Sequence, residues 1–113
     1  MGSDPGEQRA DRAARNEAVF RRVNERLEEI NETLDMDEAA FVCECASIDC
    51  AERIELALDE YEALRAVPTH FAIKPDHLLP DDERVVELHG DYVVVEKVGH
   101  AGDRARELDP RGD

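Results

Sequence analysis

The residues of this chain with the most specific chemistry are its three cysteines. Cys43, Cys45 and Cys50 lie within eight residues of one another, and the chain has no other cysteine. Thiolates and imidazoles are ligands that zinc prefers, and three cysteines with one histidine form a familiar closed tetrahedral set. A chain of 113 residues buries only a thin core, and zinc can supply on the order of 10 kcal/mol towards folding. The spacing therefore predicts a structural zinc site.

The fourth ligand has to come from elsewhere in the chain, and two histidines are candidates. His77 follows Pro75 at the start of a loop, where a rigid turn can orient the imidazole. His70 lies beside Phe71 at the start of an expected strand. We expect His77 to complete the site with the three cysteines, and His70 is the alternative. His89 falls in a hairpin loop and is not favoured.

Other roles for the three thiols stay open beside metal binding. Reduced cysteines can pack as small apolar side chains, two of them can form a disulfide, and one can act as a nucleophile. No zinc-deaminase, His-Glu-x-x-His, P-loop or dinucleotide-binding motif is present, and Glu44 should point away from its cysteine neighbours. We therefore predict no catalytic residue and no organic cofactor. The expected function is a non-catalytic, zinc-stabilised small domain that acts through protein contacts, with regulation as one such role. A small metal-dependent or thiol enzyme is the alternative.

The elements that must position the cysteines are two short strands. Residues 41–45 and 52–56 predict a pair of strands, and residues 46–51 form the turn that carries Cys50. Side chains two apart in a strand point to the same face, so Cys43 and Cys45 can reach one ion.

A long helix is expected before the cysteines. Five apolar residues recur at spacings of three and four and form one stripe on it: Phe20, Val23, Leu27, Ile30 and Leu34. We expect this stripe to pack on the sheet of its own chain. A two-helix seam between protomers is the alternative, and it would make the protein a homodimeric scaffold.

The second half of the chain predicts a short helix, a strand and a terminal hairpin. Tyr61 and Leu64 share the helix face, residues 71–74 form the strand, and residues 85–88 and 92–96 form the hairpin. The fold class expected is α+β: a long N-terminal helix on a small, mainly antiparallel sheet, with one short helix and a C-terminal β-hairpin. Residues 13–98 form the single domain, residues 1–12 a flexible N-terminus, and residues 99–113 a disordered tail.

The charge of the chain excludes several classes of partner. The net charge is −15, with 29 acidic residues against 14 basic ones, so nucleic acids and anionic membranes repel it. No run of about 20 apolar residues and no signal peptide is present, so we expect a cytoplasmic protein in which thiols stay reduced. The expected partner is an unidentified protein.

A resemblance to a known family extends over residues 15–97. The segments that carry it are Arg15–Glu17, Val23–Arg26, Phe41–Cys45, Cys50, Arg53–Leu56, Glu60–Glu62, Arg65, Pro68, Phe71, Pro75–His77 and Val93–Lys97. In these segments the chain resembles a family of small, mostly uncharacterised proteins from high-GC Gram-positive bacteria. The resemblance implies a Cys3His arrangement through Cys43, Cys45, Cys50 and His77, and it implies no enzymatic activity.

Overall fold

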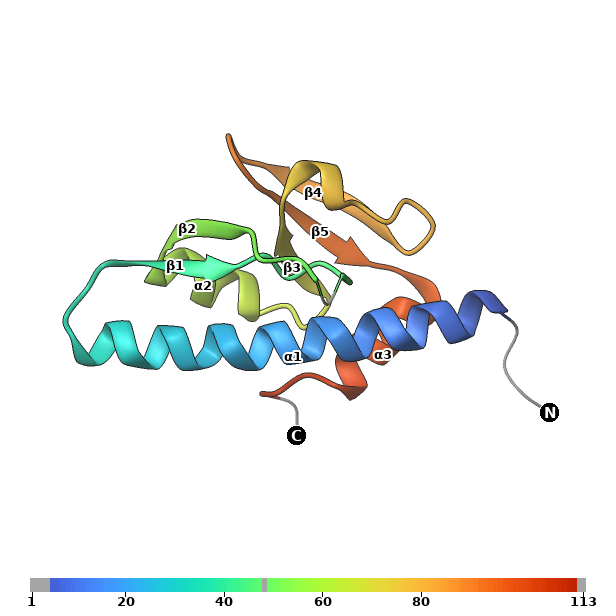
Figure 1. Ribbon diagram of the computed structural model, residues 1–113, viewed down its shortest axis with the longest axis horizontal. Helices are drawn as coiled ribbons and strands as arrows, with labels where there is room; N and C mark the ends of the chain where they lie inside the picture. Colours follow the sequence, from blue (N-terminus) through green and yellow to red (C-terminus); the bar gives the residue numbers. More distant parts are fainter. Residues whose placement is uncertain (1–4, 48, 112–113) are drawn as a thin grey trace.

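A computed structural model describes residues 5–47 and 49–111 of the chain. It has the α+β fold expected from the sequence, built on a long N-terminal helix, α1, that spans the length of the molecule (Figure 1). Two small antiparallel sheets lie on one side of α1. The elements in chain order are α1 (Pro5–Thr33), β1 (Glu38–Val42), β2 (Arg53–Ala57), α2 (Leu58–Arg65), β3 (His70–Ile73), the 3-10 turn η1 (Pro75–His77), β4 (Glu83–Leu88), β5 (Val93–Lys97) and α3 (Gly99–Glu107).

The expected strands all form, but they are divided between two sheets. The first sheet is the β1–β2 hairpin, in which Phe41 faces Ile54 across the pair. The second has the order β3–β5–β4: the terminal hairpin pairs β4 with β5, and β3 pairs with the other edge of β5. Alternating apolar residues in β1 and β2 and the β-branched run in β5 direct their side chains into one core. Antiparallel pairing is therefore predicted correctly, and the split into two sheets is new.

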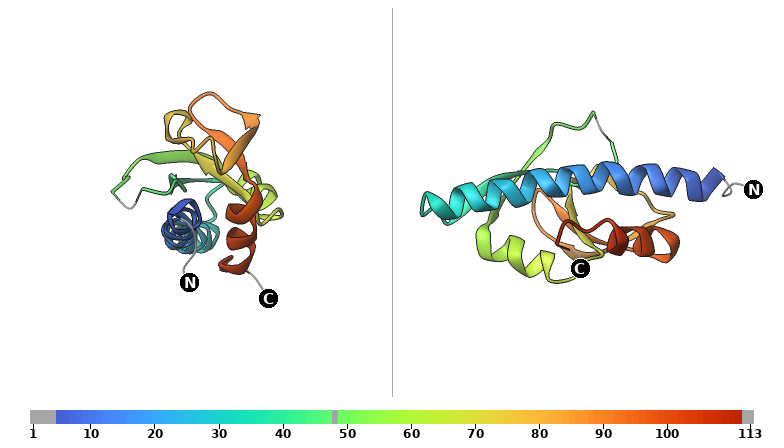
Figure 2. Two further views of the ribbon diagram at one scale, coloured as in Figure 1. Left: turned by 90° about the vertical axis from the view of Figure 1, so that its right-hand side faces the viewer. Right: turned by 90° about the horizontal axis from the view of Figure 1, so that it is seen from below.

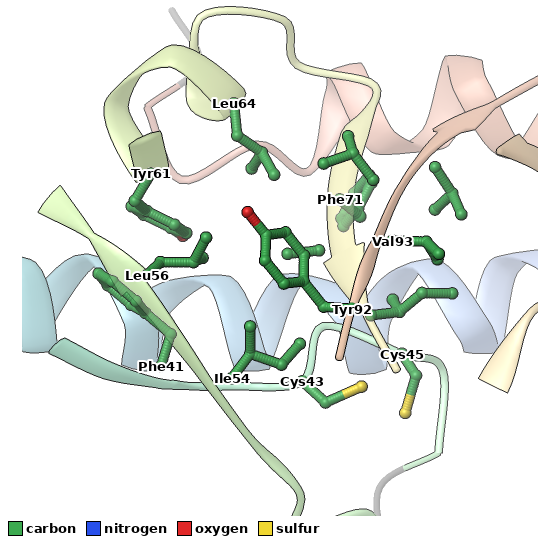
Figure 3. Packing of buried hydrophobic residues seen from close by; sticks show 14 of the residues in the cluster. Phe41, Cys43, Cys45, Ile54, Leu56, Tyr61, Leu64, Phe71, Tyr92 and Val93 are labelled. Carbon is green, nitrogen blue, oxygen red and sulfur yellow. The ribbon is translucent and has the colours of Figure 1, made fainter. Parts of the chain in front are cut away.

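The core lies where the two sheets meet α2. Phe41 and Tyr61 stack with their ring centroids 4.3 Å apart, and Ile54 and Val95 are fully buried beside them. Tyr61 and Leu64 share the buried face of α2, as their spacing indicated. Figure 3 shows Cys43 and Cys45 at the edge of this same cluster. The sulfur-bearing segment is thus anchored by the main apolar packing of the protein.

The face of α1 that packs on the sheets is not the apolar stripe. Phe20 is buried and Leu27 partly so, but Val23, Ile30 and Leu34 are 42%, 43% and 65% exposed. The expectation that the stripe packs on the sheet of its own chain is therefore wrong for these three residues. Polar residues at spacings of four, three and four lie on the buried face instead: Glu17, Arg21, Asn24 and Glu28. They are buried because each one bonds to charged or polar groups of the sheets and of the C-terminal segment.

Both ends of the chain are more ordered than the sequence indicated. The prediction of a flexible N-terminus is wrong for residues 5–12, which belong to α1. The prediction of a disordered tail is wrong for residues 99–107, which form α3 beside α1 (Figure 2). Small buried side chains, Ala10 and Ala14 on α1 and Ala101 and Ala105 on α3, let these two helices approach closely. This packing needs no large apolar group, which is why composition alone indicated disorder. Residues 1–4 and 112–113 lie outside the described part.

No helix among the described residues is long and apolar enough to span a membrane.

Candidate metal centre

The candidate site lies in the connection from β1 to β2, where the segment just after β1 bonds to both sheets. β1 ends at Val42, so the cysteines follow the strand rather than lying within it as expected. The backbone N–H of Cys43 still donates to the carbonyl of Glu52 beside β2, at 3.0 Å. The next N–H, that of Glu44, donates to the carbonyl of Ala72 in β3, at 2.9 Å. Because both sheets hold this short segment, the positions of the two cysteines are fixed by the fold.

The turn η1, which follows the C-terminal end of β3, brings His77 to the cysteines. Pro75 begins this turn, and the backbone N–H of His77 closes it on the carbonyl of Lys74 at 3.0 Å. The His77 Nδ1 atom then lies 3.5 Å from the Cys43 sulfur and 3.7 Å from the Cys50 sulfur. The three sulfurs and one ring nitrogen all lie within 4.8 Å of one another.

These separations match a single tetrahedral ion. Zinc bonds of about 2.3 Å to sulfur and about 2.0–2.1 Å to nitrogen give a tetrahedral S···N edge of about 3.5 Å. The distances from His77 Nδ1 to Cys43 and Cys50, 3.5 and 3.7 Å, lie close to that edge. These two distances allow Cys43, Cys50 and His77 to bind one ion, and the Cys45 sulfur lies within 4.8 Å of the other donor atoms, so the four residues could hold a metal ion together.

Backbone N–H groups support each of the three sulfurs. The N–H of Lys74 donates to the Cys43 sulfur at 3.3 Å. The backbone of Ser47 does the same for Cys45, and that of Glu52 for Cys50, and each bond lowers the pKa of its thiol. Such outer bonds orient sulfur ligands and spread the charge of thiolates.

The thiols differ in how readily they ionise. The pKa of Cys45 is lowered to about 5, chiefly because the Cys43 thiol donates a hydrogen bond to its sulfur. The same bond, together with burial, raises the pKa of Cys43. Burial also raises the pKa of Cys50. Cys45 is therefore the thiol of the group that ionises most readily, and the thiolate is the form of cysteine that binds metal.

One side of the site is open to solvent. Cys43 and Cys45 are buried, whereas Cys50 and His77 are half-buried beside an open depression of about 520 Å³. The depression lies between loop residues 45–47 and 49–52 and residues 76–79, and it offers a route by which an ion can enter. Asp76 lies there too, with a carboxylate oxygen 3.7 Å from His77 Nε2, on the side of the ring away from the sulfurs.

The structure distinguishes between the two histidines considered as the fourth ligand. The ring of His70 lies 3.6 Å from a carboxylate oxygen of Glu96 on the neighbouring strand, outside the group of four ligands. The expected set of Cys43, Cys45, Cys50 and His77 is thus the one that the fold brings together.

Glu44 is the residue of this region whose importance the sequence did not reveal. It is fully buried, on the opposite side of the backbone from the sulfurs, in the manner expected for its position between two cysteines. Its carboxylate accepts hydrogen bonds from Tyr61 at 2.8 Å and Asn24 at 2.9 Å, and from the N–H of Ala72 at 3.2 Å. Arg21 lies 3.4 Å away as counter-ion. The polar residues at helical spacing on α1 were the available signal, but they resemble a solvated face.

Comparisons with protein-family models, with curated proteins and with solved structures found no match.

Proposed function

We propose that Cys43, Cys45, Cys50 and His77 bind one zinc ion and that the ion is structural. The observation that carries this proposal is the convergence of four zinc-type donor atoms within 4.8 Å, from two segments separated by 34 residues at their contact. An ion held there joins the loop between β1 and β2 to the turn η1 after β3. A cross-link between such distant segments stabilises a small fold, because the unfolded chain does not hold the preformed site.

The donor set favours a structural role over a catalytic one. A catalytic zinc keeps three protein ligands and leaves the fourth position to water or substrate. Here four protein donors complete the tetrahedron, and each sulfur also accepts a backbone hydrogen bond. The carboxylate next to His77, that of Asp76, faces the ring nitrogen rather than the ion position. We propose that the domain acts through protein contacts made by surfaces outside this centre.

Metal analysis of the purified protein tests the site directly. Zinc bound per chain is measured after dialysis, and Co²⁺ is then substituted because its absorption bands report thiolate ligation and tetrahedral geometry. We expect one zinc per chain and tetrahedral Co²⁺ bands. A wild-type protein that folds and binds no zinc removes the proposal, and a Co²⁺ spectrum with a bound water in place of His77 would favour a catalytic centre.

Two histidine variants locate the fourth ligand. His77→Ala is expected to lower zinc affinity by about 100-fold or more and to change the Co²⁺ spectrum, because a donor is lost. His70→Ala is the matched control, since its ring lies against Glu96 and not against the sulfurs. It should bind zinc as the wild type does. Equal loss in both variants, or loss in His70→Ala alone, would contradict the assignment.

A further inference from the structure

The outer face of α1 carries a line of apolar side chains that the described part of the chain leaves exposed. Val19, Val23, Ile30 and Leu34 are 44%, 42%, 43% and 65% exposed. Leu34 directly follows the last residue of α1, and its N–H still donates to the carbonyl of Ile30 at 3.1 Å, as in the helix. At 100° per residue these four positions lie within about 60° of the helix circumference, opposite the buried polar face. They extend over about 22 Å of the helix at 1.5 Å per residue. In the end-on view of Figure 2, no other element covers the outer side of α1.

The spacing of these four residues reads the same in both directions. Successive gaps of four, seven and four place the midpoint of the line between Arg26 and Leu27. An antiparallel copy of the helix, related by a two-fold axis at that midpoint, therefore puts Val19 opposite Leu34 and Val23 opposite Ile30. Each copy carries both residues of a pair, so the two-fold axis produces every apolar contact twice, as an interface of this symmetry requires.

The charges along α1 favour the same antiparallel arrangement. Arg12 and Arg15 are exposed in the first half of the helix, whereas Asp35 and Asp37 are exposed just after its end. In an antiparallel pair, Arg15 of each copy lies about one helical turn beyond the partner's Leu34, beside that acidic turn. A parallel pair would place the arginines of one copy next to those of the other. The opposite charges also reduce the repulsion expected between two chains of net charge −15.

At the midpoint, Arg26 and Glu29 already form an ion pair of 3.3 Å on the helix surface, with side chains 72% and 70% exposed. A two-fold axis there brings together two such pairs, so that each arginine can also face the partner's glutamate. The centre of the line is therefore electrically balanced in the antiparallel arrangement.

We propose that α1 forms a homodimer by packing this face antiparallel against the α1 of a second copy of the chain. The interface consists of Val19, Val23, Ile30 and Leu34 of each copy. It differs from a seam built on the whole apolar stripe, because Phe20 and Leu27 face the interior of their own chain. The proposal does not depend on the metal, since no ligand of the candidate centre lies on this face.

The mass of the full-length, zinc-supplied protein in solution tests the pairing. Sedimentation equilibrium over a range from low micromolar to millimolar chain concentration should show the average mass rising towards twice the 12.7 kDa of one chain. Ile30→Glu should remain monomeric throughout, because it places a charge in the inner apolar pair, opposite Val23 of the partner subunit. Leu88→Glu, at an 81% exposed position on β4, is the matched control and should dimerise as the wild type does.

Circular dichroism and bound zinc are measured for each variant, so that unfolding is not mistaken for dissociation. A wild type that stays monomeric at millimolar concentration overturns the proposal. The proposal is also overturned if the wild type dimerises but the dimer is lost in Leu88→Glu and kept in Ile30→Glu.

The orientation is tested by photo-crosslinking. A benzoylphenylalanine residue placed at Val19 should crosslink to the partner's segment around Leu34. Crosslinks to the partner's own Val19 region would show a parallel pair and overturn the antiparallel assignment.

Discussion

Tyr61 donates a 2.8 Å hydrogen bond to the carboxylate of Glu44, whose two neighbours in the chain are cysteines of the candidate metal centre. The aromatic core on one side of this segment and the sulfurs on the other are thereby held by a single stretch of backbone. Arg21 and Asn24 of α1 contact the same carboxylate, so the long helix joins this arrangement as well. The candidate metal centre is therefore supported by the packing of α1 and α2, elements that supply none of its four donor residues.

Removal of the Tyr61 hydroxyl should weaken the fold measurably. Tyr61→Phe keeps the ring stacked on Phe41 and removes one hydrogen bond to the buried Glu44 carboxylate. Hydrogen bonds to charged groups contribute about 1.5–3 kcal/mol, so the free energy of unfolding should fall by about that amount. Urea denaturation of the zinc-supplied protein measures it. Tyr92→Phe, which removes a hydroxyl outside this network, is the control and should have a smaller effect. An equal effect in both variants would contradict the special role of Glu44.

Metal removal should destabilise the wild type much more than a ligand variant. A chelator is expected to lower the midpoint of thermal unfolding of the zinc-supplied protein, because binding energy at the site is folding energy. Cys50→Ser should be less stable than the wild type in zinc but close to it in chelator, since Cys50 is only half-buried at the edge of the core and serine is close to it in size. Calorimetry with and without zinc measures both. A difference that persists unchanged in chelator would assign Cys50 to packing rather than to metal binding.

Stability should depend on the protonation of Glu17, which is buried with Lys97 and Glu83. Burial raises the pKa of Glu17 from its ordinary value of 4.5 to about 7, and a single lysine faces two carboxylates. Because the folded state binds this proton more tightly than the unfolded state, the contribution is fully present below pH 4.5. It is lost as the pH rises to about 7.

The Glu17→Gln variant isolates this effect. Relative to the wild type, its free energy of unfolding should rise across the interval from pH 4.5 to 7, by on the order of 3 kcal/mol at most. Denaturation curves of both proteins are compared at each pH, so that the pH dependence of zinc binding cancels. A constant difference across the interval would show that Glu17 does not titrate there.

The contact between α3 and β5 depends on a glycine. A Cβ atom at Gly102 would lie 2.9 Å from the Lys97 carbonyl oxygen, closer than real contacts allow. Gly102→Ala should therefore displace α3 and lower the free energy of unfolding by about 1–3 kcal/mol. Gly90→Ala is the control, since a Cβ there meets nothing within 4 Å. Thermal melts measure both variants, and an unchanged melt for Gly102→Ala would indicate that α3 is not held against β5.

Local sequence pattern predicted most of the strands and the ligand types of the site. The alternation in residues 53–57 and the β-branched run in residues 93–97 define strands, because each depends on near neighbours only. The cysteine spacing indicated a metal site for the same reason, since two of the sulfurs lie two residues apart. Helix α3 was missed because its buried residues are alanines and a glycine, whose composition resembles that of a polar tail.

The sequence by itself determined the donor types of the candidate metal centre, the antiparallel hairpins and the apolar stripe on the long N-terminal helix. Only the tertiary structure decided that His77 and not His70 meets the sulfurs, and that α1 packs on the sheets through Glu17, Arg21 and Asn24. The physical reason is that donor type and periodicity are local properties. The choice of ligand and of buried helix face depends on partners such as Glu44 and Lys97, which are distant in the chain and make buried charges acceptable only once the fold has formed.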